Sequence, residues 1–232
     1  MLEVWKLDLR AEAGRLDLHR SLLSDDELFR ARRFVRDEDR IRFILARSTR
    51  RELLARALGC DPRRLSFEAG PFGKPRLARG FAGPLEFNTS HAGNWVLHAI
   101  ADIPVGVDVE QADPGIAVFD ELAWALSPQE RDDVARHPEP ARSLALASAW
   151  ARKEAYLKAT GEGLSRPPSE IAISPGPDGR LRLDHDRKRE GEARAWSFVD
   201  VFVAPGYAGC LVHAGPPREV SIRSYAGAGD SR

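Results

Sequence analysis

A short acidic stretch is the first group of residues that could do chemistry. In residues 105–110, Val-Gly-Val-Asp-Val-Glu, acidic residues alternate with valines. Alternate residues of a β-strand point to opposite faces, so Asp108 and Glu110 share one face while Val107 and Val109 enter the core. Two carboxylates this close repel each other unless a cation lies between them. Taken alone, the pair is equally well explained as part of a solvated strand face.

A second group lies in a segment with helical spacing. Residues 150–164 are mostly strong helix formers, and Gly161 and Gly163 can adopt the left-handed backbone that ends a helix. Glu154 and Lys158 are four residues apart and share one helix face. On an isolated surface helix such a pair contributes only about 0.3–0.5 kcal/mol. If the helix packs on the acidic strand, Glu154 adds a third carboxylate. The three would then offer the oxygen ligands that Mg²⁺ prefers, with Lys158 beside the phosphates that the metal holds.

Other residues could bind the phosphates of such a ligand. The basic candidates are Arg30, Arg42, Lys74 and His91. Each of them, taken alone, is equally compatible with an ordinary surface charge. The sequence contains neither a P-loop motif nor a Rossmann glycine motif after a strand. Its histidines and cysteines also lack the spacing of zinc ligands. The pattern therefore favours a Mg²⁺-dependent site for a ligand with several phosphates.

Composition limits the classes of protein that fit. The 232 residues are enough for one large domain or two small ones, and 35 Lys plus Arg balance 35 Asp plus Glu. A net charge of zero argues against a generic nucleic-acid binder. Cys60 and Cys210 are too few for a disulfide framework, and we expect two buried thiols. Without a signal peptide or a long apolar run, the sequence predicts a cytoplasmic protein that is not in a membrane.

The remaining elements follow from periodicity and capping signals. Residues 2–9 and 195–203 are predicted to be strands, and helices are predicted to begin at Ser24 and Ser127, where a Glu stands three residues later. Apolar spacing predicts a long helix over about residues 39–59. Residues 85–101 are typical of strand, polar loop and strand, with Asn88, Ser90 and His91 in the loop. The small and polar residues 225–232 predict a frayed end.

The second half of the sequence repeats the order of the first. Residues 51–59 and 153–161 match in base, acid, base, alanine and glycine at the same offsets, and each segment precedes a short apolar strand. An internal duplication explains this, as do two similarly patterned units. We predict an α+β fold of two similar halves, residues 1–103 and 104–232, each a small antiparallel sheet packed with a long helix. A ligand site is expected at their seam.

Four motifs in register resemble a known family. Residues 106–110 and 150–159 are similar to the two signature motifs of the 4′-phosphopantetheinyl transferases. Residues 87–93 and 73–75 resemble further motifs of the larger, surfactin-synthetase (Sfp) type. Their order and separation fit over nearly the whole chain, as does the family's pseudo-twofold build from two halves.

The resemblance implies a reaction and roles for individual residues. The reaction is Mg²⁺-dependent transfer of the phosphopantetheine arm of coenzyme A to a serine of an apo acyl or peptidyl carrier protein, releasing adenosine 3′,5′-bisphosphate. Glu154 would be the base, directly or through a metal-bound water, and Lys158 would neutralise or protonate the departing phosphate. The implied Mg²⁺ ligands are Asp108, Glu110 and Glu154. The implied contacts to coenzyme A are Arg30, Lys74, Ser90, His91 and Lys158, with Arg42 in the segment that faces the adenine.

Two positions depart from the family pattern, and two other functions stay open. Glu27 stands where well-known members have a lysine near the 3′-phosphate, and Phe43 where a small polar residue contacts the nucleotide. One alternative is another Mg²⁺-dependent enzyme acting on a nucleotide diphosphate. The other is a protein that binds coenzyme A or carrier domains without turnover. Because both halves lie on one chain, we expect a monomer.

Overall fold

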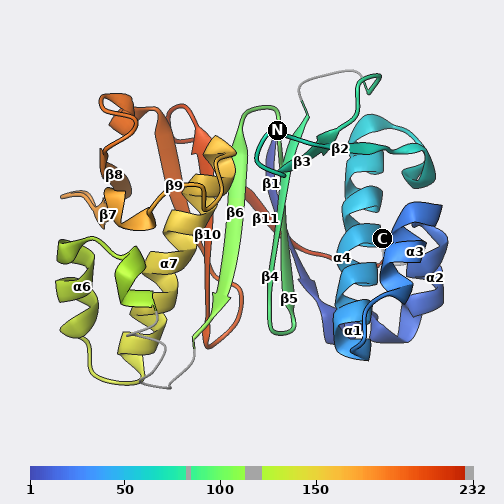
Figure 1. Ribbon diagram of the computed structural model, residues 1–232, viewed down its shortest axis with the longest axis horizontal. Helices are drawn as coiled ribbons and strands as arrows, with labels where there is room; N and C mark the ends of the chain where they lie inside the picture. The colour runs from blue at the N-terminus through green and yellow to red at the C-terminus, as the bar shows by residue number, and fades with distance from the viewer. Residues whose placement is uncertain (82–84, 113–121, 228–232) are drawn as a thin grey trace.

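The computed structural model describes residues 1–81, 85–112 and 122–227 of the chain. Two long helices, α4 (Asp37–Leu58) and α7 (Ala141–Thr160), lie on opposite sides of the molecule with β-sheets between them (Figure 1). The layers therefore follow the order helix, sheet, sheet, helix. This arrangement confirms the predicted α+β fold, with small sheets packed against long helices.

Local sequence explains where the helices begin and end. The shorter helices are α1 (Leu9–Glu12), α2 (Leu16–Ser21), α3 (Asp25–Arg32) and α6 (Pro128–Ala135). Capping boxes open α3 and α6: Ser24 exchanges hydrogen bonds with Glu27, and Ser127 does the same with Glu130. The helix α4 ends at Gly59, whose φ of 64° is the left-handed conformation that glycine adopts at low cost.

The first sheet lies against α4. Its strands are β1 (Leu2–Asp8), β4 (Glu86–Ala92), β5 (Trp95–Ala101) and β11 (Ser221–Ser224). They are arranged in the order β11-β1-β5-β4, antiparallel except that β11 pairs parallel with β1. Along β1, Trp5 and Leu7 pack in the core beneath α4, while Leu2 and Val4 pack against the second sheet. The boundary after residue 103 stays a prediction, but the C-terminal segment clearly completes the first sheet through β11.

The second sheet lies against α7. Its strands are β6 (Val105–Gln111), β9 (Trp196–Val201) and β10 (Tyr207–Ala214). The central strand β10 pairs antiparallel with both neighbours. Val107 and Val109 enter the apolar core between the two sheets, as their alternation with acidic residues predicts. Asp108 projects from the opposite face, toward α7.

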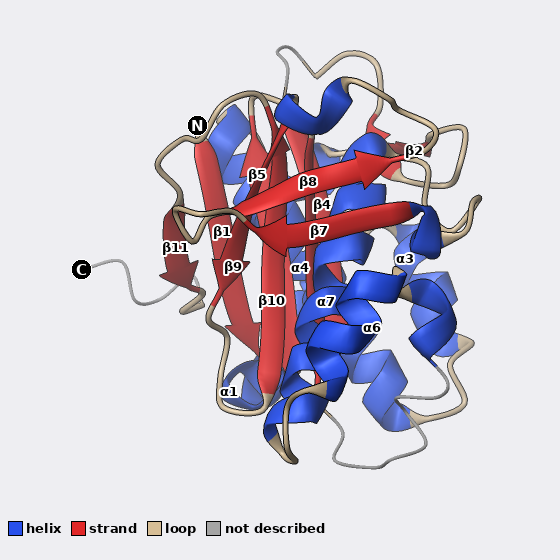
Figure 2. Ribbon diagram, turned by 90° about the vertical axis from the view of Figure 1, so that its left-hand side faces the viewer, coloured by secondary structure: helices blue, strands red, loops and turns tan. Residues whose placement is uncertain are grey.

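Two hairpins complete the fold. They are formed by β2 (Phe67–Ala69) with β3 (Pro75–Leu77), and by β7 (Ile171–Pro175) with β8 (Leu181–Asp186). Figure 2 shows β7 and β8 running across the direction of β9 and β10. Apolar side chains fill three layers of core: between α4 and the first sheet, between the two sheets, and between the second sheet and α7.

Some boundaries differ from those predicted. The helix expected over residues 150–164 begins at Ala141, because residues 141–149 are rich in alanine and leucine, which favour helix. The polar residues expected in a loop, Asn88, Ser90 and His91, lie within the strand β4. The chain turns instead at Gly93, whose φ is 50°. These three side chains are therefore held on a hydrogen-bonded strand.

The C-terminal region is packed where a frayed end was predicted. Tyr225 is 8% exposed, and its hydroxyl donates to the Glu52 carboxylate at 2.6 Å. Residues 228–232, the rest of that prediction, lie outside the described residues. Both cysteines are free thiols; the prediction that they are buried is confirmed for Cys210, whereas Cys60 is half-buried. Among the described residues, every helix is too short or too polar to cross a membrane.

Candidate active site

A glycine brings the helix α7 directly onto the strand β6. A Cβ atom at Gly106 would collide with the carbonyl oxygen of Ala155 and the backbone of Ala159. Any larger side chain would therefore push α7 away from the sheet. The close approach places Glu154 and Lys158 over the part of β6 that carries the acidic residues.

Asp108 is the centre of the resulting cluster. It is 1% exposed, and its Oδ1 accepts hydrogen bonds from Ser90 Oγ at 2.6 Å and from Lys158 Nζ. Lys158 Nζ also donates to Ser90 Oγ at 3.1 Å. Asp108 Oδ2 is buried and has no hydrogen-bond partner among the described residues. The three interacting side chains come from β4, β6 and α7, so the cluster joins the two halves.

The other two predicted carboxylates lie around Asp108. Glu154 Oε2 is 3.9 Å from Lys158 Nζ. Burial raises the pKa of Glu154, and the Asp108 carboxylate raises it further. Burial, followed by repulsion from Asp108 and Glu154, raises the pKa of Glu110 to about 7. Burial also raises the pKa of Asp108, although Lys158 opposes this. The three carboxylates thus lie in an environment where added positive charge is favourable.

The donor atoms suit a hard divalent cation, but they are not grouped as a finished metal site. Carboxylate oxygens are the ligands that Mg²⁺ prefers, and Asp108 Oδ2 offers a buried oxygen without a partner. Within the described part of the chain, no three His, Cys, Asp or Glu side chains are close enough to hold a metal ion. Lys158 Nζ supplies the positive charge that contacts Asp108 instead.

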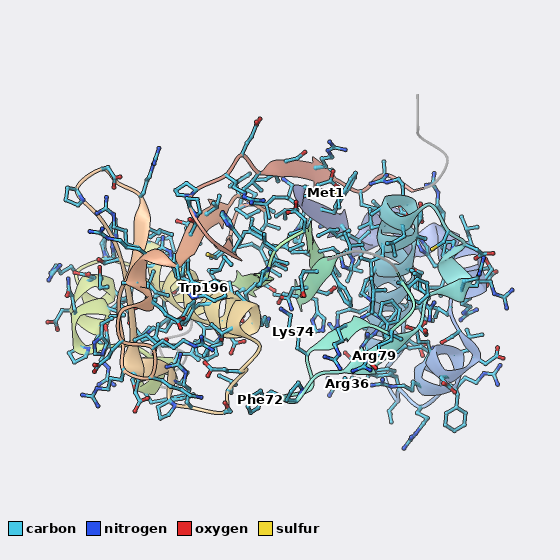
Figure 3. All side chains as sticks on the ribbon, turned by 90° about the horizontal axis from the view of Figure 1, so that it is seen from above. Met1, Arg36, Phe72, Lys74, Arg79 and Trp196 are labelled. Carbon is cyan, nitrogen blue, oxygen red and sulfur yellow. The ribbon has the colours of Figure 1, made fainter. Side chains whose placement is uncertain are left out.

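Three of the predicted phosphate contacts lie beside this cluster. His91 follows Ser90 on β4, and its pKa is lowered by burial and by the cation of Arg42. Lys74 Nζ donates to the carbonyl oxygen of Val105 at 2.9 Å, and burial lowers its pKa. Figure 3 shows Lys74 in the space between the two halves of the molecule. A cavity of about 400 Å³ is lined by Arg42, Phe43 and His91, among others.

Arg30 is the one predicted contact that lies apart from the carboxylates. It is exposed on α3 and lines a neighbouring cavity of about 480 Å³, together with Glu27. A larger cavity of about 1030 Å³ runs along β8 and β9 and contains none of the predicted residues. The structure therefore gathers the acidic residues with Ser90, His91 and Lys158, and leaves Arg30 one cavity further along.

Glu27, which departs from the family pattern, has a structural partner. Its Oε2 accepts from Arg51 Nε at 2.6 Å, and its Oε1 lies 3.4 Å from Arg50 Nη2. Arg51 is 2% exposed and also donates to two backbone carbonyl groups. Removing Glu27 would leave a buried guanidinium without its counter-charge, so this residue belongs to the framework of the first half.

Sequence reasoning missed two kinds of residue in this region. Asn88 Oδ1 accepts from the backbone N–H of Val107 at 2.9 Å, which ties β4 to β6 across the two sheets. Arg47 and Arg50 of α4 line both the 400 and the 480 Å³ cavities. The spacing of apolar residues along this helix could have predicted the burial of Arg50, because Arg50 lies four residues from buried Ala46 and four from buried Leu54. A charged residue at that phase must be buried.

Comparisons with known proteins agree with this arrangement. Residues 104–212 match the model of the 4′-phosphopantetheinyl transferase superfamily, and residues 10–102 match the N-terminal region of 4′-phosphopantetheinyl transferases. A 4′-phosphopantetheinyl transferase of Bacillus subtilis is 30% identical over 77% of this chain and 78% of its own length. HetI of a Nostoc species, also a 4′-phosphopantetheinyl transferase, is 32% identical over 86% of this chain and 82% of its own.

The chain belongs to the 4′-phosphopantetheinyl transferase superfamily, as its motifs predicted. Its similarity to the Sfp protein of Bacillus subtilis, 26% identity over 88% of this chain and 89% of that protein, confirms the larger type. Among solved structures, the holo-[acyl-carrier-protein] synthase of Helicobacter pylori in complex with coenzyme A is 22% identical. It covers 48% of this chain and 99% of its own, with a TM-score of 0.40.

Proposed function

We propose that this protein transfers the 4′-phosphopantetheine arm of coenzyme A to a serine hydroxyl of an apo acyl or peptidyl carrier protein. The observation that carries the proposal is the cluster in which Lys158 and Ser90 both contact Asp108, with Glu154 one helical turn before Lys158. In this cluster Glu154 can accept a proton, and Lys158 can neutralise the charge of a phosphate. Relatives that align with most of this chain are named for this activity.

The residues would divide the reaction between them. Glu154 accepts the proton of the carrier serine as that oxygen bonds to the phosphorus attached to the pantetheine arm. The bond between this phosphorus and the bridging oxygen of the pyrophosphate then breaks, and adenosine 3′,5′-bisphosphate leaves. Lys158 can turn from Asp108 to the departing phosphate and neutralise its charge. Such transfers depend mainly on positioning and charge neutralisation.

Mg²⁺ is the metal that the three carboxylates would hold. Asp108, Glu110 and Glu154 are the proposed ligands. Burial raises the pKa of all three, and repulsion from neighbouring carboxylates raises the pKa of Glu110 and Glu154 further, which a divalent cation would relieve. When bound, the metal supplies charge neutralisation to the pyrophosphate.

The basic residues would hold the rest of coenzyme A. Ser90 and His91 lie beside Lys158, where the pyrophosphate must sit for reaction. Lys74 donates to the backbone of Val105 at the start of β6. Arg42 lines the cavity that contains His91, and Arg30 lines the neighbouring cavity. Cytoplasmic location and a monomeric state stay predictions.

The test is a measurement of carrier mass. Purified protein is incubated with coenzyme A, Mg²⁺ and a panel of apo carriers from fatty-acid, polyketide and peptide-synthetase systems. We expect at least one carrier to gain the mass of one phosphopantetheine arm, and chelation of the metal should stop the gain. The absence of a mass gain across the whole panel would refute the proposal.

A variant in the acidic cluster tests the site itself. Asp108→Ala should abolish the mass gain, because it removes the buried carboxylate that orients Lys158 and Ser90. The folded state is checked by circular dichroism. An Asp178→Ala variant at the β7–β8 hairpin, where Asp178 forms an exposed ion pair with Arg182, serves as the control and should keep activity. Full activity in Asp108→Ala would overturn the assignment of the site.

A further inference from the structure

The strands β4 and β6 lie side by side at the seam between the two halves (Figure 1). In the part of the chain that the structure describes, β4 pairs only with β5 and β6 only with β10, so both are edge strands. No backbone hydrogen bond joins them within these residues. The backbone groups on the facing edge of β6 therefore need partners from side chains, because an unpaired buried N–H group is costly.

Side chains of the first half supply those partners. The backbone N–H of Val107 donates to Asn88 Oδ1 at 2.9 Å. Lys74 Nζ donates to the carbonyl oxygen of Val105, also at 2.9 Å. Positions 105 and 107 are two apart on β6, so these two backbone groups lie on the same edge of the strand. The two side chains thus hold this edge in the way that a neighbouring strand would.

The contact of Asn88 also fixes the position of Asp108. Val107 immediately precedes Asp108, whose Oδ1 accepts from Ser90 Oγ at 2.6 Å. Ser90 lies two residues after Asn88, so the two contacts join β4 to β6 at neighbouring positions. A slip of β6 along β4 by one residue, about 3.3 Å, would break both contacts. Asn88 therefore sets the register between the acidic residues of β6 and the polar residues of β4.

An asparagine side chain suits this task. Asn88 is 5% exposed and Val107 is 0% exposed, so the bond is shielded from water. Only the oxygen of the amide can accept from a backbone N–H, and this defines how the side chain is turned. Because the amide is uncharged, the bond depends neither on the pH nor on the charge of a bound ligand.

The bond of Asn88 differs from its neighbours because the proposed reaction does not require it to open. Lys74 and Ser90 are proposed contacts of coenzyme A, so their bonds to β6 can be exchanged for bonds to its phosphates. Asn88 lines the cavity of about 400 Å³, but its oxygen is directed at the backbone of Val107. Its hold on β6 can therefore persist while ligands bind on both sides of the seam.

We propose that Asn88 is a positioning residue that keeps β4 and β6 in register and so couples the binding of coenzyme A to the binding of the metal. The inference rests on the proposed function, which supplies coenzyme A and Mg²⁺ as ligands. Ser90 and His91 of β4 would contact the pyrophosphate, and Asp108 and Glu110 of β6 would hold the metal that neutralises it. Each ligand strengthens the binding of the other only if the two strands stay correctly placed.

The first experiment measures this coupling without a carrier and without turnover. Calorimetry gives the Kd of coenzyme A in buffer with Mg²⁺ and in buffer with a chelator. For the wild type we expect Mg²⁺ to lower the Kd at least about tenfold, within the usual range for coupled ligands. In Asn88→Ala this factor should fall below about threefold, while the Kd without Mg²⁺ stays within about threefold of the wild type. An unchanged factor in Asn88→Ala, or a wild-type factor near one, would overturn the inference.

Thr89→Val is the matched control on the same strand. Thr89 Oγ1 lies 2.9 Å from Nδ1 of His98 on β5, so this variant removes a hydrogen bond of the same length within the first half. It should keep the wild-type factor even where it lowers stability. Loss of the factor in Thr89→Val as well would show a general effect of packing and contradict a specific role of Asn88.

Two further variants of Asn88 separate the hydrogen bond from folding. Asn88→Asp keeps an oxygen acceptor for the Val107 N–H, so its factor should stay within about threefold of the wild type. If Asn88→Ala does not fold, Asn88→Ser is measured in its place, because its hydroxyl is too short to reach that N–H. A factor as low in Asn88→Asp as in the truncated variant would mean that the acceptor is not what matters.

Kinetics of carrier modification test the effect on the reaction. In Asn88→Ala, kcat should fall about 10- to 100-fold, as expected for a displaced reacting group, and the KM for coenzyme A should rise only as far as the Kd measured with Mg²⁺. A purely structural role would lower the urea midpoint and leave kcat per folded molecule unchanged, which would refute the positioning role. If no carrier is modified but Asn88→Ala still loses the coupling, the transfer proposal fails and the role of Asn88 stands.

Discussion

The helices α4 and α7 carry matching residues at three positions. The first matching pair, Arg51 and Lys153, makes the same kind of contact in both helices, whereas the other two pairs make different contacts. Arg51 of α4 donates to the carbonyl groups of Pro62 and Leu65, both at 2.8 Å. Lys153 of α7 donates to two carbonyl groups in the same way, those of Pro168 and Ile171. In both helices the buried base therefore fixes the chain that follows the helix.

Each buried base also pairs with a glutamate that closes a capping box. Arg51 bonds to Glu27 at 2.6 Å, and Lys153 lies 2.8 Å from Glu130. These glutamates are the third residues of α3 and α6. The ion pair with Arg51 explains why this chain has a glutamate at position 27, where well-known members of the family have a lysine.

The next two matched positions differ. In α4, Glu52 accepts from Tyr225 and Arg56 stacks on Trp5. In α7, Glu154 and Lys158 face Asp108. The first sheet packs Trp5 and Leu7 against α4, whereas β6 presents acidic residues to α7. The matched residues therefore pack the core in α4 and face the acidic cluster in α7, because the two helices cover different strands.

Replacing the matched glutamates, Glu154 of α7 and Glu52 of α4, should give the largest difference in activity between the two helices. Glu154→Gln keeps the shape of the side chain but removes the proton acceptor, so the rate of transfer should fall by about 10⁴-fold. Glu52→Gln should leave the rate within about twofold and cost about 1 kcal/mol of stability through its bond to Tyr225. The measurement is the initial rate of carrier modification, with urea unfolding as the check on stability.

The two outcomes are informative together. Comparable losses of rate in Glu52→Gln and Glu154→Gln would mean that both helices contribute to the reaction. An active Glu154→Gln enzyme would remove Glu154 from the role of base and leave it a supporting carboxylate.

The second prediction concerns the feature that the halves share. Glu27→Ala and Glu130→Ala should each lower the free energy of unfolding by about 3–5 kcal/mol, because each leaves a buried cation without its partner. The losses should be similar, since Arg51 is 2% exposed and Lys153 is 0% exposed. Urea denaturation monitored by tryptophan fluorescence measures both.

An exposed ion pair provides the control. Arg76 and Glu68 are 2.9 Å apart on the β2–β3 hairpin with largely exposed side chains, so Glu68→Ala should cost at most about 1 kcal/mol. A loss from Glu27→Ala as small as this would show that the two buried pairs are not equivalent.

The sequence alone predicted the fold class and the strand and helix faces on which Asp108, Glu154 and Lys158 lie. Alternation of acids and valines placed Asp108 correctly, because a strand buried on one face tolerates only one arrangement of its side chains. Spacing of four residues likewise placed Glu154 with Lys158 on one face of α7. The capping boxes at Ser24 and Ser127 located two helix starts, since their signal is local.

What could not be predicted depends on contacts between distant segments. Ser90 and Asn88 were assigned to a loop because they are polar, yet each has a partner on β6 that makes a strand favourable. The burial of Arg50 and Arg51 needs Glu27 and the following backbone to satisfy them. Nothing in the local pattern of α4 specifies those partners.

The smallest expected effect is a pH dependence of stability that originates in the first half. His98 of β5 is 1% exposed, and its two ring nitrogens lie 2.9 Å from the hydroxyl oxygens of Thr49 and Thr89. Burial, with the nearby cations of Arg50 and Arg47, lowers the pKa of His98 to about 3. The unfolded chain binds a proton at His98 below about pH 6.5, while the folded protein does not. The stability contributed by the neutral ring is therefore complete above pH 6.5 and is lost as the pH falls toward 3.

Replacing His98 removes its contribution to the pH dependence of the free energy of unfolding. The loss amounts to about 1.4 kcal/mol per pH unit well below pH 6.5, and to about 1 kcal/mol between pH 7 and pH 5.5. Over that interval, the free energy of unfolding of the wild type should fall by about 1 kcal/mol more than that of His98→Gln, whatever the variant costs at pH 7. Urea unfolding at the two pH values measures the difference, and parallel profiles would show that His98 becomes protonated in the folded protein. A neutral His98 also avoids placing a further positive charge beside Arg50 and Arg47.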